Sequence, residues 1–280
     1  MSSNTNSSHS NYIHGSDPQE QRRLSLLNDL MNASSLRELR LKKDDRVLDV
    51  GSGLGQFSRA MARVAGPGGS VVGVERDLDQ LAHANQLAEM ESESGLVEFR
   101  QGDGFALPLF DEEWQCFDVV HARFLLEHIN EPFRIVSQMK AAARPGGRVV
   151  LVDDDHDGIR LWPEPWGFAL LWQAYVGSYQ RLGNDPFVGR KLVSLLHEAG
   201  LTQIRNSMVF FGGCAGNEEF ELVLANLLGI FEGARDEMLV DDCLDQVSFD
   251  RAMAALVDWG KDPSASLWYS MCWAEGFVPV

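Results

Sequence analysis

The chain has 280 residues, of which 45% are hydrophobic and 23% charged, a composition typical of a globular protein with a sizeable buried core. Its formal net charge is −17, and because this field repels phosphate polymers we expect no nucleic-acid partner. The four cysteines form no CxxC pair, which argues against a disulfide framework or a zinc site. Without a long apolar run or a basic-then-apolar leader, we expect a cytoplasmic protein that does not enter a membrane.

Residues 1–17 are predicted to form a flexible N-terminal segment that closes as a lid. Residues 1–11 are rich in Ser and Asn, whereas Tyr12, Ile13 and His14 form an apolar-aromatic island that needs a surface to pack on. A tail with an incidental tyrosine is the alternative. From Pro18 to Leu39, apolar residues at helical spacing predict a helix, which residues 32–35 could divide in two.

The next hundred residues alternate between strand and helix patterns. This alternation requires crossover connections and therefore predicts an α/β fold: a Rossmann-like, mostly parallel seven-stranded sheet with helices on both faces. The predicted strands cover residues 46–50, 70–75, 96–102, 117–121 and 148–153, and the predicted helices cover 56–64, 78–90 and 132–143.

The C-terminal part continues with helices over 166–181 and 190–199, a strand over 204–211, and a seventh, edge strand within 267–278. Residues 218–258 lack strand signals and carry more apolar residues than a surface helix needs. We therefore expect three parts: the N-terminal segment 1–17, a sheet domain formed by 18–215 and 263–280, and a helical insertion over 216–262. The insertion would act as a lid or as the contact of a homodimer.

A glycine-rich loop follows the first predicted strand and opens a helix, in the order Asp49-Val-Gly51-Ser52-Gly53-Leu-Gly55. Glycines let the backbone turn sharply and approach a ligand, and the helix start offers free N–H groups to an anionic group. A tight turn without a ligand is the alternative. Dinucleotide sites prefer GxGxxG, but Gln56 stands where the third glycine would be.

Two acidic residues end the next two strands. Glu75 can accept both hydroxyls of a ribose, and Asp103 adds an acceptor for an adenine amino group. Together with the glycine loop, they fall at the carboxyl ends of consecutive strands, where open α/β sheets bind ligands.

In this combination the chain resembles the class I S-adenosylmethionine-dependent methyltransferases, over about residues 40–155. The resemblance rests on VLDVGSGLGQF (47–57), VVGVERD (71–77), QGDGFALPL (101–109), FDVVHARFLLEHI (117–129) and RPGGRVVLVD (144–153). The segment containing Tyr12 to Gly15 also looks like that of small-molecule members, in which it folds over the cofactor.

The resemblance implies an S-adenosylmethionine cofactor and methyl transfer to oxygen, nitrogen or carbon of a small organic molecule. It implies that the loop from Gly51 to Gly55 holds the methionine part and that Glu75 holds the ribose. The remaining implied cofactor residues are Asp49, Ser52, Gly53 and Gln56 around the loop, Arg76 beside the adenine ring, Asp103 and Gly104 at the adenine, and His121 beside the methionine part.

Methyl transfer to a protonated acceptor can use a general base. The catalytic candidates are His121, Tyr12 and His14, and His156 is a further histidine near the predicted site; each has a packing role as its alternative. The run Asp153 to His156 lies where a strand alternates its faces, so we expect one residue to face the pocket and no metal site. Aromatic residues between Trp162 and Phe187 predict either core packing or a wall for an apolar or aromatic acceptor.

Two other functions compete. An NAD(P)-dependent oxidoreductase is disfavoured by Gln56 and by the lack of a Tyr-x-x-x-Lys pair. A non-catalytic cofactor-binding protein of the same fold stays open, because methyl transfer requires no single obligatory nucleophile.

Overall fold

The computed structural model describes residues 18–240 and 244–280, with side chains described from residue 29 onward. The predicted lid, including Tyr12 and His14, lies outside the described residues. In the described part, helix α1 (Pro18–Leu39) runs without the predicted break at residues 32–35. Asn32 and Ser35 are buried and accept hydrogen bonds from Arg123, so their polar side chains serve to anchor the helix.

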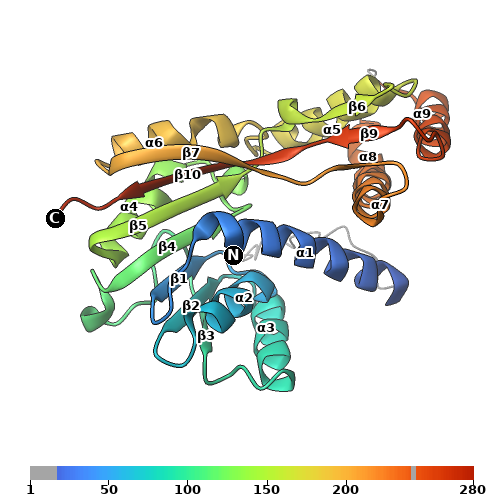
Figure 1. Ribbon diagram of the computed structural model, residues 1–280. Helices are drawn as coiled ribbons and strands as arrows, with labels where there is room; N and C mark the ends of the chain where they lie inside the picture. The colour runs from blue at the N-terminus through green and yellow to red at the C-terminus, as the bar shows by residue number, and fades with distance from the viewer. Residues whose placement is uncertain (1–17, 241–243) are drawn as a thin grey trace, which may run out of the picture.

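A seven-stranded sheet forms the centre of the molecule, in the order β3-β2-β1-β4-β5-β10-β7 (Figure 1). Strands β1 to β5 pair in parallel, whereas β10 pairs antiparallel with both β5 and β7. This confirms the predicted Rossmann-like α/β sheet. The strands are β1 (Arg46–Val50), β2 (Ser70–Glu75), β3 (Val97–Gln101), β4 (Phe117–Arg123), β5 (Ala143–Asp153), β7 (Thr202–Phe210) and β10 (Ser270–Phe277).

The prediction that the last strand forms the edge was wrong. Strand β10 lies between β5 and β7, and β7 is the edge. The buried Glu275 of β10 accepts hydrogen bonds from Arg148 on β5 and Arg205 on β7, so a charged residue is accommodated inside the sheet. The order of strands along the chain does not reveal such an insertion.

Helices cover both faces of the sheet. Consecutive strand residues point to opposite faces, and Val47 and Leu48 of β1 accordingly belong to two different apolar cores. The core around Val47 includes residues of α1, α2 and α3, and the core around Leu48 includes residues of α4 and α6. These helices are α2 (Gln56–Ala65), α3 (Leu78–Met90), α4 (Pro132–Ala142) and α6 (Leu192–Glu198), and α6 follows a 3₁₀ turn, η4 (Val188–Lys191). Shorter 3₁₀ turns are η1 (Asp111–Glu113), η2 (Leu126–His128) and η3 (His156–Gly158).

A second region lies beyond the end of the sheet, at the right of Figure 1. It contains α5 (Phe168–Arg181) and a small sheet of β6 (Arg160–Trp162), β9 (Ser266–Trp268) and β8 (Gly213–Cys214). The described part of the predicted insertion is helical, with α7 (Glu218–Gly233), α8 (Arg235–Met238) and α9 (Gln246–Trp259). Helices α8 and α9 pack against α5, whereas α7 packs against α1 and contacts α5 through Phe231 and Trp172.

Candidate functional site

The glycine loop connects β1 to α2, as predicted, and its geometry excludes larger residues. Gly51, Gly53 and Gly55 all have positive φ angles (76°, 55° and 72°). A Cβ at Gly55 would lie 2.3 Å from the ring of Phe99, and one at Gly51 would lie 3.1 Å from Leu125. The loop is therefore held close to β3 on one side and to the segment after β4 on the other.

The loop presents polar groups without partners. Ser52 Oγ is buried and has no hydrogen-bond partner among the described residues. Gly55 caps α2 without a side-chain acceptor, and the first turn, beginning at Gln56, contains no acidic residue. The N–H groups and the positive dipole end of α2 are therefore free to meet an anionic group of a ligand.

Glu75, at the end of β2, is fixed by the backbone around it. Its Oε2 accepts the N–H of Gly53 at 2.9 Å, and its Oε1 accepts the N–H of Asp77 at 2.8 Å. The half-buried carboxylate thus joins the glycine loop to the start of α3. Each oxygen keeps a further lone pair for a hydroxyl donor.

The predicted adenine residues lie at the end of the neighbouring strand. The N–H of Gly102 donates to the carbonyl of Glu75 at 3.0 Å, which links the two strand ends. Asp103 is exposed and accepts the N–H of Phe105 at 2.9 Å, which leaves its other oxygen available. A Cβ at Gly104 would lie 2.8 Å from Ile135, and Arg76 is exposed beside Glu75. The structure therefore brings the glycine loop, Glu75 and Asp103 together at the carboxyl ends of neighbouring strands.

Asp49 and His121 lie beneath the loop rather than on its surface. They are neighbours across β1 and β4, and His121 Nδ1 lies 2.8 Å from Asp49 Oδ1. The other oxygen of Asp49 accepts from Ser58 in α2. His121 has no exposed surface, and its Nε2 has no partner among the described residues. The pair fixes the base of the loop, and a direct catalytic role for His121 stays a prediction.

Arg123 supports the same region from the side of α1. Its guanidinium stacks 4.4 Å above the ring of Phe57 and donates to Asn32 at 2.8 Å. Burial lowers the pKa of Arg123 to about 10, against the opposing charge of Asp49, so the side chain stays protonated at neutral pH. Helix α1 is thereby attached to the side of the sheet that carries the glycine loop.

A second group of side chains gathers at the carboxyl ends of β4 and β5, and we call it the acidic-aromatic cluster. Its polar members are Glu127 in η2, Asp153 and Asp154 at the end of β5, and His156 in η3. Asp153 accepts the N–H of Leu126 at 2.9 Å. His156 Nε2 lies 3.6 Å from Glu127 Oε2 and 3.9 Å from Asp154 Oδ2, which are ion-pair distances longer than hydrogen bonds.

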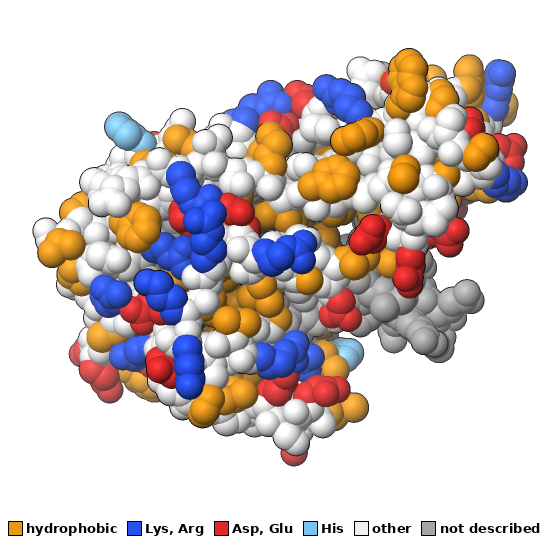
Figure 2. All heavy atoms as spheres, in the orientation of Figure 1, with side chains coloured by type: hydrophobic (Ala, Val, Ile, Leu, Met, Phe, Trp, Pro, Cys, Tyr) orange, Lys and Arg blue, Asp and Glu red, His pale blue; other side chains and the backbone are white. Residues whose placement is uncertain are grey.

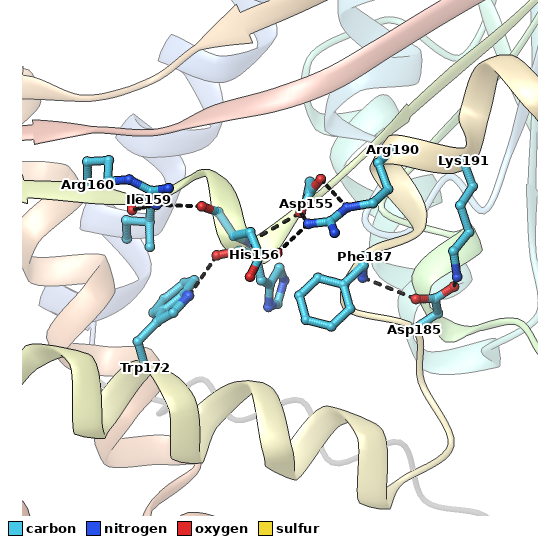
Figure 3. A network of polar contacts seen from close by, with 10 residues as sticks. Asp155, His156, Ile159, Arg160, Trp172, Asp185, Phe187, Arg190 and Lys191 are labelled. Atoms are coloured by element: carbon cyan, nitrogen blue, oxygen red, sulfur yellow. Dashed lines mark hydrogen bonds and ion pairs between the residues drawn. The ribbon is translucent and has the colours of Figure 1, made fainter.

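Aromatic rings surround His156. The ring centroids of Trp172, Tyr175 and Tyr179 lie 5.6, 5.8 and 5.0 Å from the imidazole, and Trp172 Nε1 donates to the His156 carbonyl at 2.7 Å. Figure 3 shows the imidazole reaching from its loop toward α5, with Trp172 to one side and Phe187 to the other. Phe231 of α7 packs on Trp172 and Tyr175, at 6.1 and 5.9 Å, so the insertion covers this cluster. The members of the cluster are Glu127, Asp153, Asp154, His156, Trp172, Tyr175, Tyr179, Phe231 and Tyr269.

Burial changes the protonation of the cluster. Burial and the neighbouring charge of Glu127 raise the pKa of Asp154 to about 7, and the same two causes raise the pKa of Asp153 well above its usual value. Burial alone would lower the pKa of His156, but Glu127 and Asp154 outweigh it, so that pKa is raised. Asp153 and Asp154 therefore keep their protons to a higher pH than they would in water.

Asp155 has a different role from its neighbours in the run from Asp153 to His156. It accepts the N–H of Asp157 and pairs with Arg190, so it closes the loop as expected for part of this run (Figure 3). No group of three or more potential metal ligands converges in the described part of the chain. No helix among the described residues is long and apolar enough to cross a membrane.

Sequence reasoning missed Glu127 and Tyr269 as site residues. Glu127 stands within the segment 117–129 that carried the resemblance, six residues after the predicted strand 117–121, and that position was the available signal. Tyr269 hydrogen-bonds the carboxylate of Asp154 from the junction of β9 and β10. Its distance from Asp154 along the chain left no local signal.

Part of the chain is similar to known proteins. A family model described as a methyltransferase domain matches residues 41–169, from just before β1 to the start of α5. An uncharacterized methyltransferase of Schizosaccharomyces pombe is 29% identical over 157 residues, which cover 54% of this chain and 55% of that protein. A demethylmenaquinone methyltransferase of Lactobacillus johnsonii is 26% identical over 179 residues, covering 60% and 72%. The chain spans about half the length of the first curated relatives it matches.

Among solved structures, phosphoethanolamine N-methyltransferase 2 of Haemonchus contortus, in complex with phosphomonomethylethanolamine and S-adenosylhomocysteine, has the same fold. Its TM-score is 0.55 at 18% identity, with 90% of this chain and 53% of that chain covered. Residues 41–169 therefore match a methyltransferase domain, and the sheet and glycine loop of this region resemble those of the class I S-adenosylmethionine-dependent methyltransferases.

Proposed function

We propose that the chain transfers the methyl group of S-adenosylmethionine to a small, apolar or aromatic organic acceptor. The observation that carries this proposal is the arrangement of Glu75, whose two oxygens are held by the N–H groups of Gly53 and Asp77. This contact joins the glycine loop to the ribose-binding carboxylate in one preformed unit. A preformed site lowers the entropic cost of binding a nucleoside.

The residues present fit S-adenosylmethionine. The loop from Gly51 to Gly55 leaves no room for a Cβ at Gly55, and it carries the unpartnered Ser52 Oγ, which suits a polar amino-acid moiety. Asp49 and His121 support the loop from below, and Gln56 opens α2 beside it. Glu75 would accept the ribose hydroxyls.

At the neighbouring strand end, Asp103 and Gly104 would meet the adenine, and exposed Arg76 would flank the ring. When bound, the cofactor supplies an electrophilic methyl group, so the protein needs to align donor and acceptor. Holding two reactants in line can contribute several kcal/mol to lowering the barrier.

The acidic-aromatic cluster is the favoured place for the acceptor. It lies at the carboxyl ends of β4 and β5, next to the end of β1, and Leu125 connects it to the glycine loop by its contact at Gly51. The helices of the insertion cover it through Phe231. The insertion would thus serve as a lid, and Tyr12 and His14 stay candidates for the lid of residues 1–17.

The charge of the molecule supports a small-molecule acceptor over nucleic acid. The net charge is −17, and on the face in Figure 2 basic side chains lie among acidic ones. Arg205, for example, pairs with Glu38 and Glu275. A homodimer through the insertion and a cytoplasmic location stay predictions, and sedimentation analysis at micromolar concentration would test the dimer.

The experiment compares ligands by thermal shift and then measures turnover. S-adenosylhomocysteine at 100-fold its dissociation constant should stabilise the protein by about 2.7 kcal/mol, whereas NAD should not. Equal shifts with NAD would contradict the proposal and favour an oxidoreductase. No shift with either ligand would also contradict it. Incubating a metabolite extract with methyl-labelled cofactor then separates an enzyme from a non-catalytic binding protein, because only an enzyme yields labelled product.

A further inference from the structure

The acidic-aromatic cluster brings three carboxyl groups together in the protein interior. Glu127 and Asp153 are 4% and 1% exposed, and Asp154 is half-buried beside them. Among the residues whose side chains the structure describes, no Lys or Arg forms an ion pair with these three carboxylates. His156 lies against both Glu127 and Asp154, and the more exposed His128 lies 3.4 Å from the other oxygen of Glu127. Burying ionised carboxylates without cationic partners is costly, so Asp153 and Asp154 retain protons in the ligand-free protein, and a cationic ligand would supply the compensating charge when they ionise.

Several of these buried polar atoms have no hydrogen-bond partner in the described structure. They are Glu127 Oε2, Asp153 Oδ1, Asp154 Oδ1 and His156 Nδ1. The side chains of Glu127 and His156 are only 6% and 4% exposed, so water does not reach them freely. Buried polar groups in folded proteins are nearly always paired, and four unpaired atoms in one cluster indicate a polar ligand.

The aromatic residues of the cluster favour a positively charged ligand. Trp172, Tyr175 and Tyr179 present π-systems around His156, and the faces of such rings attract cations. Carboxylates attract cations too and repel anions. The two kinds of group favour the same occupant, a cation attached to an apolar or aromatic body.

We propose that the acidic-aromatic cluster binds the methyl acceptor as a protonated amine, with Glu127 and Asp154 at its ammonium group and the rings of α5 along its apolar body. The inference rests on the proposed methyl transfer and narrows its acceptor from oxygen, nitrogen or carbon to nitrogen.

The cluster also provides a destination for the proton that nitrogen must lose. The ammonium group transfers one N–H proton to a carboxylate of the cluster, which leaves a neutral amine with a lone pair. That lone pair forms the new N–C bond while the C–S bond breaks and its electrons stay on sulfur. Asp154, whose pKa is raised to about 7, can accept such a proton near neutral pH and release it afterwards.

Binding of three matched probes tests the inference without turnover. We would titrate 2-phenylethylamine, 2-phenylethanol and phenylacetate into the protein saturated with S-adenosylhomocysteine, following tryptophan fluorescence and calorimetry. The amine should bind at least tenfold more tightly than the alcohol, and phenylacetate most weakly. Glu127→Gln should remove most of the preference for the amine. Glu131→Gln is the matched control: Glu131 is exposed and lies four residues further along the chain, so this variant should retain the preference.

An alcohol that binds as tightly as the amine, or a preference that survives both Glu127→Gln and Asp154→Asn, would overturn the inference. Should these variants fail to fold, calorimetry of the wild-type protein in buffers of different ionisation enthalpy gives an independent answer. Amine binding should release protons from the cluster, and no proton release would contradict the inference.

The affinity for S-adenosylhomocysteine separates this inference from the proposed function. If it binds while the amine preference is absent, the inference fails alone; if it does not bind, the proposed function fails.

Discussion

Replacing Glu75 by Ala removes the carboxylate that we expect to hold the ribose. Two hydroxyls would lose a charged acceptor, which should weaken binding of S-adenosylhomocysteine by about 1.5–3 kcal/mol, or roughly 10- to 150-fold in Kd. Calorimetry measures this directly, because the product analogue binds without turnover.

The same substitution also affects the ligand-free protein. Glu75 accepts the N–H groups of Gly53 and Asp77, and losing two such bonds should lower the free energy of unfolding by about 1–3 kcal/mol. For a chain of this size each kcal/mol lowers Tm by about 2–4 °C. Glu91→Ala is the matched control, since Glu91 is exposed at the end of α3 and should change neither quantity by more than about 0.5 kcal/mol.

Binding by Glu75→Ala with the affinity of the wild-type protein would refute the ribose assignment. An equal loss in Glu91→Ala would show that the effect is not specific to the site.

Four further outcomes follow from the same geometry. Asp103→Ala should weaken cofactor binding by only about 0.5–1.5 kcal/mol, less than Glu75→Ala, because Asp103 is exposed and one adenine contact is at stake; calorimetry giving the reverse order would contradict this. Gly55→Ala should destabilise the fold by about 2–4 kcal/mol in denaturant unfolding, since its φ is 72° and its Cβ would meet Phe99 at 2.3 Å, whereas Gly95→Ala, with no atom within 4 Å, should be nearly neutral. The ligand-free protein should lose stability as the pH rises from about 5 to 8, because the raised pKa values of Asp153, Asp154 and His156 mean that the folded state binds more protons than the unfolded one. In thermal melts, Asp154→Asn should reduce this dependence of stability on pH. A wild-type protein that gains stability over the same range would contradict the reasoning. Deleting residues 1–16 should leave Tm nearly unchanged while lowering turnover, and full activity of the truncated protein would favour the tail interpretation.

The range from pH 5 to 8 distinguishes the acidic-aromatic cluster from other carboxyl groups of the protein, whose pKa values are lowered. Glu38, Glu113 and Asp118 have lowered pKa values, in each case with an arginine partner among the causes. Their stabilising contribution is complete above the unfolded pKa and is lost only as the pH falls below about 4.5. A change between pH 5 and 8 therefore reports on groups with raised pKa values.

The geometry of the glycine loop and its neighbouring strand ends could be predicted from sequence because its signals are local. The strand, the glycine loop and the helix after it are consecutive, and positive φ angles at Gly51, Gly53 and Gly55 match the residue type required. Glu75 and Asp103 follow directly after strands of the same sheet. Parallel strands then bring their carboxyl ends together without further information.

The acidic-aromatic cluster, which we propose to hold the acceptor, could not be predicted in the same way. Glu127, His156, Trp172 and Tyr269 come from four segments whose contacts depend on packing across the whole chain. The aromatic residues of α5 gave equal support to core packing and to a binding wall, and both descriptions fit the structure. Strands β6, β8 and β9 have two or three residues each, too short for a period to be recognised.

The most direct test of the central claim is a crystal structure with S-adenosylhomocysteine. We expect both ribose hydroxyls within hydrogen-bond distance of Glu75, the amino-acid moiety along Gly51 to Gly55, and the sulfur atom directed toward the acidic-aromatic cluster. A ligand whose ribose lies away from Glu75, or whose sulfur faces away from Glu127 and His156, would contradict the claim.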